Sequence, residues 1–311
     1  MDQTRFHVVF NPTAGTAGSL GLDVEALAAL FATAQLPARI DPDASDDLEA
    51  RIRRAVDSGA EIIVAAGGDG TATAIANALF GTKRTLAVLP LGTANLLARD
   101  LGLPPTLEET VNGLAAMETR WIDVGEVNGH YFLHKVVIGV VPGIAAAREA
   151  LRGAGDWRRW ATFSAWVVRR IARARRFAVD ISSSGSPRHV RRVQSMAVAN
   201  NEYDAALGHF FSRKRLDGGM LTLYLLKRIS LRDVVRLSVE MVLGTWRDDD
   251  SLDIERAEAL TLRTRKRVVN VMLDGEVMTL TTPLRFRIHK GALAVLAPAR
   301  PDAGSPATES G

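Results

Sequence analysis

The sequence contains no cysteine among its 311 residues, which excludes disulfide bonds, thiolate metal sites and cysteine nucleophiles. Long apolar runs are also missing. The longest candidates, Val136–Ala147 and Trp160–Val168, fall short of the roughly 18 apolar residues that a membrane-spanning helix needs, and Pro142 interrupts the first. The first residues lack the apolar core of a signal peptide, so a cytoplasmic location is the default expectation.

Two familiar nucleotide motifs are absent as well. The chain has neither a Gly-x-x-x-x-Gly-Lys-Ser/Thr loop nor a Gly-x-Gly-x-x-Gly run, so binding of the P-loop or dinucleotide type is unsupported. His130 and His134 stand four residues apart, but Tyr131 follows His130, so the chain has no His-Glu-x-x-His motif and a zinc site is not predicted. The composition, 47% apolar and 24% charged, is that of a globular protein, and the length favours two domains.

The net charge of +4 is unevenly distributed. Residues 1–120 carry nine basic and fifteen acidic side chains, whereas Arg148–Arg192 carries twelve arginines and three acidic residues. Apolar residues follow helical spacing over Trp160–Ile171, which predicts peripheral contact with an anionic membrane surface. The alternative is a helix packed on a domain with its basic face in solvent. Nucleic-acid binding is not predicted, because no such motif is present and the first part of the chain is net acidic.

Short apolar runs alternate with helical patterns in the first 120 residues. Strands are expected at Phe6–Phe10, Ala38–Ile40, Glu61–Ala66 and Leu86–Leu89, and helices at Leu20–Ala34, Asp46–Ser58, Ala72–Phe80 and Ala94–Leu101. This order predicts an α/β domain whose parallel sheet is covered by helices on both faces.

The pattern changes near residue 120 to strands joined by turns. They are expected at Trp121–Val127, Tyr131–Val141, Phe177–Ile181, Val190–Ala199, Met220–Leu226, Ala259–Thr264, Val268–Leu273 and Leu284–Ile288. Helical stretches interrupt them near Gly155–Arg175 and Leu231–Leu243. A second, mainly antiparallel β domain is therefore predicted over 121–291, and the Pro/Gly/Ser/Ala-rich tail 301–311 is expected to be disordered.

Three glycine-rich loops follow strands of the predicted parallel sheet: Asn11–Gly15, Gly67–Thr71 and Leu91–Asn95. Ligands of such sheets bind at the carboxyl ends of the strands. Glycines allow close backbone approach there, and free amides at helix N-termini suit phosphate oxygens. The three loops together predict a nucleotide-phosphate site.

Asp69 is unexpected in a loop that suits anions, because its carboxylate is itself negative. A Mg²⁺ ion shared between Asp69 and phosphates would resolve the conflict. The structural alternative is that Asp69 caps a helix beginning near Ala72, and that Thr93 caps Ala94–Leu101 in the same way. Recurrence of such loops at three strand ends favours nucleotide binding.

The chain resembles the diacylglycerol kinase catalytic-domain family, which includes bacterial lipid kinases, sphingosine kinases and ceramide kinases. Four segments carry the resemblance over roughly residues 5 to 298. Asn11–Gly15 is similar to Asn-Pro-x-Ser/Ala-Gly, and Gly67–Thr71 matches Gly-Gly-Asp-Gly-Thr. Pro90–Asn95 is similar to Pro-x-Gly-Thr-x-Asn, and Leu273–Glu276 matches Leu-Asp-Gly-Glu. The second motif alone is shared with NAD kinases, whereas the four together are specific.

The resemblance implies an N-terminal domain like that of phosphofructokinase and NAD kinase, completed by about 292–300, and a C-terminal β-sandwich for lipid. It implies ATP between the domains and Mg²⁺-dependent transfer of the γ-phosphate to the hydroxyl of diacylglycerol or a related lipid. Asp69 would organise the catalytic Mg²⁺. The implied nucleotide-binding residues are Asn11, Thr13, Gly15, Gly67, Gly68, Asp69, Gly70, Thr71, Gly92, Thr93 and Asn95.

The resemblance also assigns catalysis to the late Asp-Gly-Glu motif. Asp274 is expected to accept the hydroxyl proton and Glu276 to help or to bind metal, although these two roles could be exchanged. Taken alone, Asp274-Gly275 would be an ordinary hairpin turn.

Several positions depart from the family pattern. Thr73 and Ala74 stand where the family usually has Asn-Glu, and Leu96 stands where many members have Asp. A structural Mg²⁺ is implied at Asp217, yet Gly218 replaces a neighbouring acidic residue. These departures leave two alternatives, an NAD kinase-like enzyme with a soluble acceptor and a catalytically weak lipid- or nucleotide-binding protein. The acceptor lipid and the oligomeric state, a homo-oligomer included, stay open.

Overall fold

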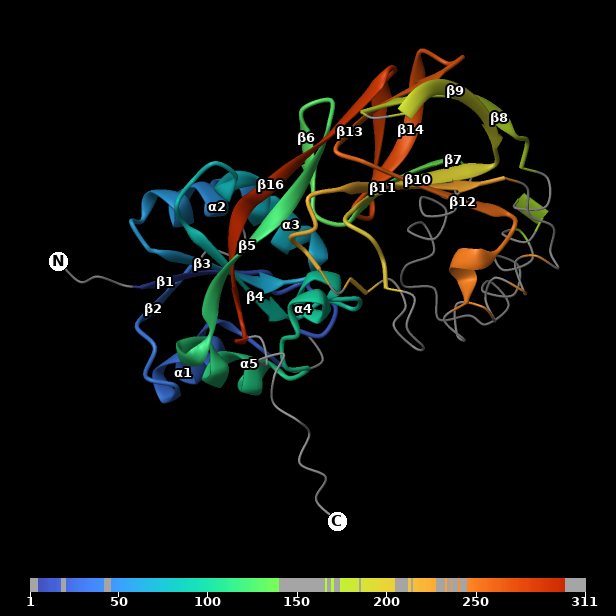
Figure 1. The fold of residues 1–311 in the computed structure, drawn as a ribbon. Helices are drawn as coiled ribbons and strands as arrows, with labels where there is room; N and C mark the ends of the chain where they lie inside the picture. The colour runs from blue at the N-terminus through green and yellow to red at the C-terminus, as the bar shows by residue number, and fades with distance from the viewer. Residues whose placement is uncertain are drawn as a thin grey trace. The chain divides into compact units, whose positions relative to one another are not determined.

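A computed structural model describes residues 5–17, 21–41, 46–139, 166, 169–170, 174–184, 186–204, 212–213, 215–227, 233, 236, 240 and 245–299. Backbone contacts divide the chain into an N-terminal unit, Met1–Trp121 with Ala294–Gly311, and a C-terminal unit, Ile122–Leu293 (Figure 1). Among the described helices, none is long and apolar enough to cross a membrane. Most of the predicted helical stretches Gly155–Arg175 and Leu231–Leu243, and all of the tail 301–311, lie outside the described residues.

The N-terminal unit is built on a parallel sheet with strand order β2-β1-β3-β4-β16. Its strands are β1 Phe6–Phe10, β2 Ala38–Ile40, β3 Ile62–Gly67, β4 Thr85–Pro90 and the end of β16 Leu284–Ala297. Its helices are α1 Val24–Thr33, α2 Leu48–Asp57, α3 Asp69–Leu79, α4 Leu96–Leu101 and α5 Leu107–Gly113, followed by the 3-10 turn η1 Leu114–Ala116. This confirms the predicted α/β architecture.

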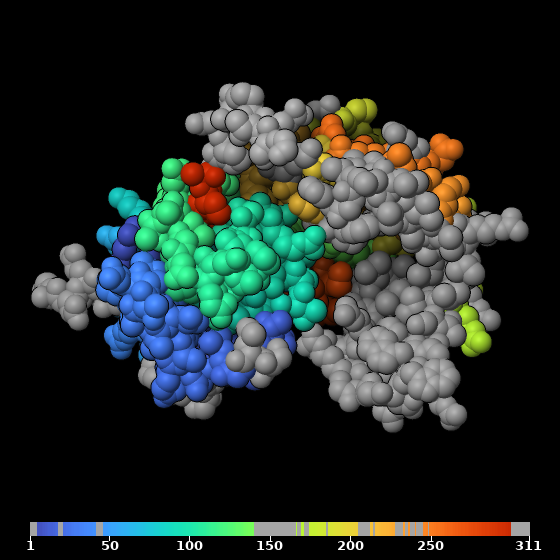
Figure 2. All heavy atoms as spheres, turned by 90° about the horizontal axis from the view of Figure 1, so that it is seen from below, coloured from blue at the N-terminus to red at the C-terminus, as the bar shows by residue number. Residues whose placement is uncertain are grey.

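Alternate residues of the buried strands point to opposite faces of this sheet. Phe6, Val8 and Phe10 face α1 and α5, where they meet Phe31 and Val111 in one apolar cluster. Helices α2 and α3 contact each other and strands of the sheet, and they cover the other face (Figure 1). Figure 2 shows the side on which α1, in blue, and α5, in green, lie. Helices on both faces leave the carboxyl ends of the strands as the place where loops gather.

Two helix boundaries differ from the prediction in a way that matters for the site. Helix α3 begins at Asp69, not near Ala72, because Gly68 is extended and serves as its N-cap. Helix α4 begins at Leu96, and its N-cap is Asn95, not Thr93. Asp and Gly are weak helix formers in a helix interior, but an acidic residue in the first turn is favoured by the helix dipole. Helix α5 lies in a segment for which no element was predicted.

The C-terminal unit consists of two sheets of mainly antiparallel strands. The first contains β5 Glu118–Val127, β6 His130–Phe132, β8 Phe177–Ser183, β9 Ser186–Val193, β13 Ala259–Thr264 and the first part of β16. The second has the order β12-β11-β10-β7-β14-β15, from β7 Lys135–Gly139, β10 Ser195–Asn200, β11 Leu221–Leu226, β12 Leu252–Ala257, β14 Val268–Leu273 and β15 Glu276–Thr281. The two sheets share an apolar cluster that joins Leu262 and Phe286 to Val198 and Leu223. The predicted β-rich second domain is therefore confirmed.

Two predicted strands are each broken in the structure. Tyr131–Val141 was expected as one strand, but β6 ends at Phe132 and β7 begins at Lys135. Val190–Ala199 is likewise divided between β9 and β10 at Gln194. Neither break has a glycine or proline to mark it, so the local pattern favours continuity. The breaks are fixed by contacts with distant residues, of which those at Leu133 and His134 belong to the candidate site.

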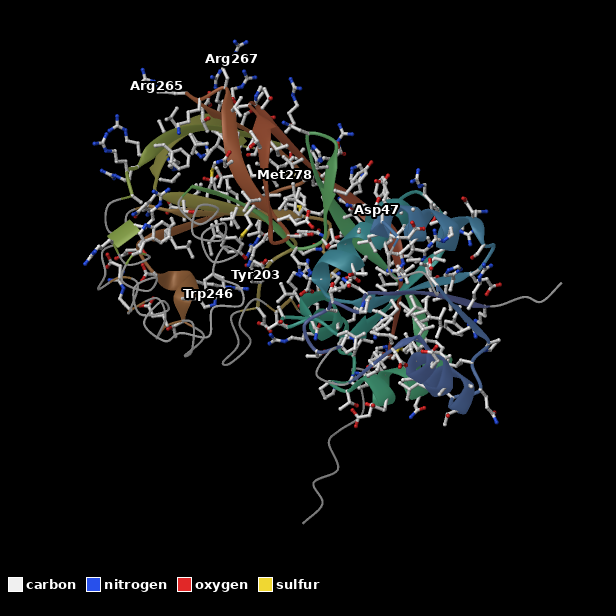
Figure 3. All side chains as sticks on the ribbon, turned by 180° about the vertical axis from the view of Figure 1, so that it is seen from behind. Asp47, Tyr203, Trp246, Arg265, Arg267 and Met278 are labelled. Carbon is white, nitrogen blue, oxygen red and sulfur yellow. The ribbon has the colours of Figure 1, made fainter. Side chains whose placement is uncertain are left out.

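A smaller aromatic cluster lies beside the second sheet. The rings of Tyr203, Tyr224 and Trp246 follow one another with centroid distances of 5.8 and 5.9 Å (Figure 3). Arg265 and Arg267, in the turn between β13 and β14, instead point away from the unit into solvent (Figure 3).

Candidate functional site

The three glycine-rich loops of the N-terminal unit are joined by hydrogen bonds at the carboxyl ends of β1, β3 and β4. The side-chain amide of Asn11 donates to the hydroxyl of Thr71 over 3.3 Å. The backbone amide of Thr16 donates to the carbonyl of Leu91 over 3.0 Å. The first loop therefore contacts both of the others, and residues as far apart in the sequence as Asn11 and Asn95 form one surface.

Glycine is required where these loops approach one another. A Cβ atom on Gly92 would lie 2.6 Å from the Cα of Gly68, and one on Gly15 would lie 2.7 Å from the hydroxyl of Thr93. The first neighbour is backbone, which cannot rotate away as the end of a side chain can. The second and third loops thus touch backbone to backbone, because neither carries a side chain at that point.

The surface that these loops present offers donors to an anion. Thr13, Gly15, Gly70 and Thr93 are exposed, whereas Thr71 is buried beneath them. No side chain caps the start of α3, which follows Gly68. The first amides of a helix have no partner within it, so this end of α3 presents unpaired N–H groups and the positive end of the helix dipole.

Asp69 caps a helix, but not its own. Its Oδ1 accepts from the backbone amides of Leu96 at 2.7 Å and Leu97 at 3.4 Å, which are the first two residues of α4. The expected alternative, a cap on the helix of Asp69 itself, is therefore wrong. Both hydrogen bonds use Oδ1, and within the described residues Oδ2 has no hydrogen-bond partner. One carboxylate oxygen remains for another ligand, and carboxylate oxygens are ligands that Mg²⁺ prefers.

Asn11 and Asn95 shape the loops with their side chains. The Oδ1 of Asn11 accepts from the amide of Thr13 at 3.0 Å and from its hydroxyl at 2.8 Å. Asn95 has left-handed backbone angles, and its side chain turns back to accept from the amide of Gly92 at 2.7 Å and to donate to the carbonyl of Pro90 at 3.2 Å. The polar atoms of both side chains are thus used inside the loops.

A buried arginine behind the first loop was not identified from the sequence. Arg51 on α2 is only 3% exposed, and its guanidinium donates to the carbonyl of Phe10 over 2.6 Å. The carboxylate of Asp41, also buried, lies 3.8 Å from Arg51. This arrangement fixes the peptide that leads into Asn11. In the sequence, Arg51 stood on the polar side of an amphipathic helix and gave no sign of burial.

Asp274 of the C-terminal unit occupies the two-residue turn between β14 and β15. Asp274 and Gly275 both have positive φ, 46° and 103°, as a tight hairpin turn requires. The carboxylate accepts from three consecutive backbone amides, those of Leu133 at 2.6 Å, His134 at 3.0 Å and Lys135 at 2.8 Å. Asp274 therefore makes the expected hairpin turn and is also held firmly by the break between β6 and β7.

Burial raises the pKa of the Asp274 carboxyl above its usual value. The three backbone donors and the positive charge of Arg213 act in the opposite direction and limit that rise. A carboxylate with a raised pKa is a better proton acceptor at neutral pH than an ordinary surface aspartate.

Arg213 supports the turn that holds Asp274. It is 2% exposed and donates to the carbonyls of Leu133 at 2.6 Å and Asn200 at 2.8 Å. Its other terminal nitrogen lies 3.0 Å from Nδ1 of His134. Burial and the adjacent arginine hold the pKa of His134 well below its usual range, so the ring is neutral and can accept from the guanidinium. The sequence placed Arg213 only within a basic run.

Asp123 is a second buried carboxylate that the sequence analysis missed. It accepts from the amide of Gly219 at 2.6 Å and from the amide of Gly291 at 2.9 Å. Its own amide donates to the carbonyl of Leu216 over 2.7 Å. Asp123 thus fixes the loop before β11 to the bend within β16. No motif marked it, because its partners are backbone groups far along the chain.

The remaining predicted residues show fewer contacts. Glu276 is exposed at the first position of β15. The carboxylate of Asp217 pairs with Arg215 at 3.2 Å. Within the part of the chain that the structure describes, no group of three His, Asp or Glu side chains could hold a metal ion. The structural Mg²⁺ at Asp217 stays a prediction from the sequence.

Two protein-family models match successive parts of this chain. Residues 5–127 match the diacylglycerol kinase catalytic domain, and residues 139–297 match the YegS C-terminal NAD kinase beta sandwich-like domain. A Pseudomonas aeruginosa protein named "Probable lipid kinase YegS-like" is 30% identical over 278 residues, which cover 84% of each chain. A Bacillus subtilis diacylglycerol kinase is 42% identical over 81 residues, 24% of this chain and 25% of that protein.

Solved structures share the fold at lower identity. A diacylglycerol kinase from Bacillus anthracis superposes with a TM-score of 0.65 at 20% identity, covering 94% of this chain and 96% of that one. An NAD kinase from Archaeoglobus fulgidus in complex with ATP gives a TM-score of 0.50 at 13% identity, covering 94% and 92%. At such identities the likeness establishes the arrangement of the chain, which agrees with the predicted NAD kinase-like architecture.

Proposed function

Because this chain belongs to the family of YegS-like lipid kinases, with a diacylglycerol kinase catalytic domain, we propose that it phosphorylates a lipid hydroxyl with ATP. The acceptor would be diacylglycerol or a related lipid. The observation that carries the proposal is the joining of three loops around the uncapped start of α3. Such an arrangement suits a chain of phosphates, because amide and hydroxyl donors converge on one exposed surface.

In this proposal the nucleotide phosphates bind along the exposed loop residues. Thr13 and Thr93 supply hydroxyls, and the backbone of Gly70 supplies an amide at the start of α3. Asn11 and Asn95 act mainly by shaping the loops, as their hydrogen bonds indicate. The close approach of Gly92 to Gly68 would keep the second and third loops in register for adjacent phosphates.

Mg²⁺ would be held by Asp69 together with phosphate oxygens, and when bound it would neutralise charge on the transferred group. The donor set fits, because Oδ2 of Asp69 is available while Oδ1 keeps α4 in place. A single protein carboxylate with phosphates and water is a usual environment for this ion.

Asp274 would act as the general base. Its carboxylate would take the proton of the lipid hydroxyl as the hydroxyl oxygen bonds to the γ-phosphorus and the bond from phosphorus to the β,γ-bridging oxygen breaks. The three backbone amides that donate to the carboxylate hold it in one orientation, and its raised pKa makes it a better proton acceptor at neutral pH. Glu276, exposed one residue beyond the turn, would assist through metal or solvent.

A lipid kinase must reach its substrate in a bilayer, and we propose that the basic segment Arg148–Arg192 contacts an anionic membrane surface. Only part of this segment lies in the described residues. There, the exposed ring of Trp166 lies 5.7 Å from the guanidinium of Arg170, and strand β9 presents Arg191 and Arg192 to solvent. Aromatic and arginine side chains together suit the boundary of a bilayer.

The test is to incubate the protein with γ-labelled ATP, Mg²⁺ and mixed lipid vesicles, and to resolve labelled products by chromatography. We expect a labelled lipid, whose identity names the acceptor. The label should be lost in Asp274→Ala, while Gln35→Ala, at an exposed turn position that also has positive φ, should retain it. The carboxylate of Asp274 also accepts hydrogen bonds from three backbone amides, so its removal affects stability. Urea unfolding of each variant is therefore measured beside its activity, to separate lost catalysis from lost folding.

Two outcomes would contradict the proposal. Labelled NADP in a parallel incubation with NAD, without labelled lipid in the incubation with vesicles, would favour a soluble acceptor. ATP binding without any transferred label would favour a binding protein that lacks activity.

A further inference from the structure

The outer face of the first sheet of the C-terminal unit is a candidate for a second binding surface. Leu260 and Leu262 of β13 point into the core, so Thr261 and Arg263 point outward. Thr261 is paired with Arg285 on β16 and with Ser182 on β8. Arg285 therefore shares a row with two hydroxyl-bearing side chains across three neighbouring strands.

Positive charge dominates this outer face. Its described acidic residues are Asp180, to which Arg188 donates over 2.8 and 3.0 Å, and Glu126, which lies 2.7 Å from His289. Arg263 stands opposite Asp180 in the register of β13 and β8, whereas Arg192, Arg285 and Arg287 are exposed and make no ion pair with any residue that the structure describes. The face thus carries five arginines, Arg188, Arg192, Arg263, Arg285 and Arg287, against the carboxylates of Asp180 and Glu126, so its net charge is positive.

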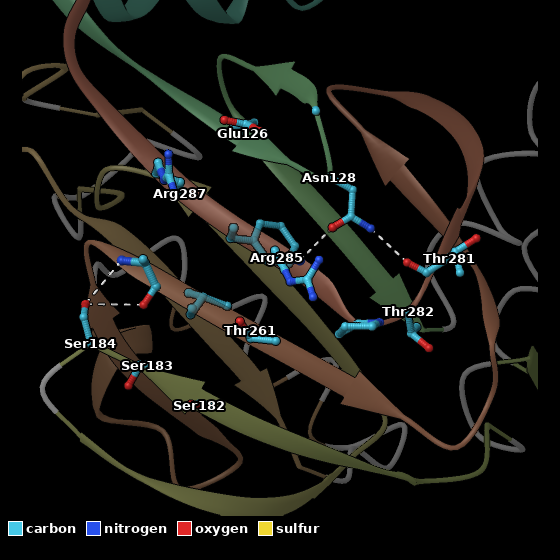
Figure 4. A pocket seen from close by; sticks show the side chains of 15 residues that line it. Glu126, Asn128, Ser182, Ser183, Ser184, Thr261, Thr281, Thr282, Arg285 and Arg287 are labelled. Atoms are coloured by element: carbon cyan, nitrogen blue, oxygen red, sulfur yellow. Dashed lines mark hydrogen bonds between the residues drawn. The ribbon is translucent and has the colours of Figure 1, made fainter.

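An open depression of about 830 Å³ lies on this face (Figure 4). Arg285 and Arg287 line it together with the hydroxyl groups of Ser182, Ser184 and Thr261 and with the carboxylate of Glu126, which lies 2.7 Å from His289 (Figure 4). Its floor is fixed by Asn128, which accepts from the amide of Arg285 at 2.8 Å and donates to the carbonyl of Thr281 at 2.8 Å. Guanidinium and hydroxyl groups are the donors with which proteins bind phosphate oxygens.

We propose that this face binds the phosphate groups of anionic phospholipid headgroups. The depression is wide, and the basic surface extends from it through Arg192 to the edge strand β9, where Val190 is 60% exposed. A broad basic surface with an apolar side chain at its margin suits many headgroups in a plane better than one free phosphate ion. The inference adds an interface to the proposed function but does not depend on it, because binding is measured without turnover.

The experiment compares binding to vesicles of phosphatidylglycerol and phosphatidylcholine with binding to vesicles of phosphatidylcholine alone. In Arg285→Gln/Arg287→Gln we expect about a 30-fold weaker affinity for the anionic vesicles, equivalent to about 1 kcal/mol for each arginine removed. The matched control is Arg265→Gln/Arg267→Gln, which removes the same charge from an exposed turn outside the depression. We expect the control to weaken binding to the anionic vesicles by less than half as much, in free energy, as Arg285→Gln/Arg287→Gln does.

The outcomes separate the sources of the phosphate. Equal losses in the two double variants would overturn the proposal, because any surface charge would then serve equally. Displacement of the protein from vesicles by inorganic phosphate, but not by sodium chloride of equal ionic strength, would assign the site to free phosphate and overturn the headgroup assignment. Label transfer to lipid in detergent micelles should be unchanged in both variants, so a failure of the kinase proposal would appear separately.

Discussion

The carboxylate of Asp69 accepts the backbone amide hydrogen of Leu96 at 2.7 Å, and so joins the first residue of α3 to the first residue of α4. One oxygen of the carboxylate performs this structural role, and the other stays available for a metal ion. The structural role of Asp69 and its proposed role in binding Mg²⁺ can therefore be separated by substitution.

Asp69→Asn retains an oxygen that can accept from Leu96, so we expect its unfolding free energy to stay close to that of the wild type. Asp69→Ala removes the cap and should lower it by about 1 kcal/mol. Both should lose most of the phosphoryl transfer, because neither offers a charged oxygen to Mg²⁺. Urea unfolding and the labelled-ATP assay check this, and near-normal transfer by Asp69→Asn would refute a metal role for Asp69.

Gly92→Ala should disrupt the loop surface. The added Cβ would lie 2.6 Å from the Cα of Gly68, so the two loops must separate at a cost of about 1–3 kcal/mol. We expect weaker ATP binding by calorimetry as well as lower stability.

Gly113→Ala is the matched control for this substitution. Its Cβ would meet only the end of the Met117 side chain, at 3.4 Å, and alanine is favoured over glycine in a helix. ATP affinity should be unchanged there. Equal behaviour of the two variants would show that the contact between Gly92 and Gly68 has no role in binding.

The pH dependence of transfer should report Asp274 and its neighbour Arg213. A base must be ionised, so kcat/KM is expected to fall as pH drops through the raised pKa of Asp274. In Arg213→Gln the loss of a nearby positive charge raises this pKa further, and the acidic limb should shift to higher pH. Arg213→Lys keeps the charge and should shift it less. A lower rate with an unshifted limb would leave Arg213 with a purely structural role.

His7 should make folding sensitive to acid. It is 2% exposed at the second position of β1, and neither ring nitrogen has a hydrogen-bond partner in the described part of the chain. Burial lowers its pKa, chiefly by disfavouring the charged ring. Below the ordinary pKa of 6.5 the unfolded chain binds a proton that the folded protein does not, so the unfolding free energy should fall as pH falls.

His7→Leu should therefore flatten the dependence of stability on pH between about 7 and 5, by at most about 1.4 kcal/mol for each pH unit. At neutral pH it should be as stable as the wild type or more so, because two unpaired polar atoms are removed from the core. His130→Gln, at an exposed position, is the control and should keep the slope. Guanidinium unfolding at several pH values measures both, and an unchanged slope in His7→Leu would contradict the assignment.

The strands of the N-terminal unit were predictable because each is a short apolar run bounded by turn residues. Phe6–Phe10 and Ala38–Ile40 have the bounds that the sequence indicated. The loops at their ends were predictable for the same reason, since glycine and asparagine mark them directly. Strands and loops were therefore predictable where the residues that determine them stand next to one another in the sequence.

The groups that hold Asp274 could not be predicted in this way. The break at Leu133 has no glycine or proline to mark it, and it is fixed by Asp274, 141 positions later, and by Arg213, 80 positions later. Asp123 likewise binds amides at Gly219 and Gly291. Backbone amides and carbonyls occur at almost every residue, so a partner of this kind leaves no mark on the sequence.

Strand β16 has a consequence for how the protein is made. Its residues Leu284–Arg287 pair with β13, whereas Ala294 and Val295 pair in parallel with β4. During synthesis β1 to β4 are translated first. The end of β16, which pairs with the edge of β4, is translated only after the rest of the C-terminal unit. An unpaired edge is a template for aggregation. In the N-terminal unit the edge of β4 is thus exposed for most of synthesis, and this unit is completed last although it is translated first.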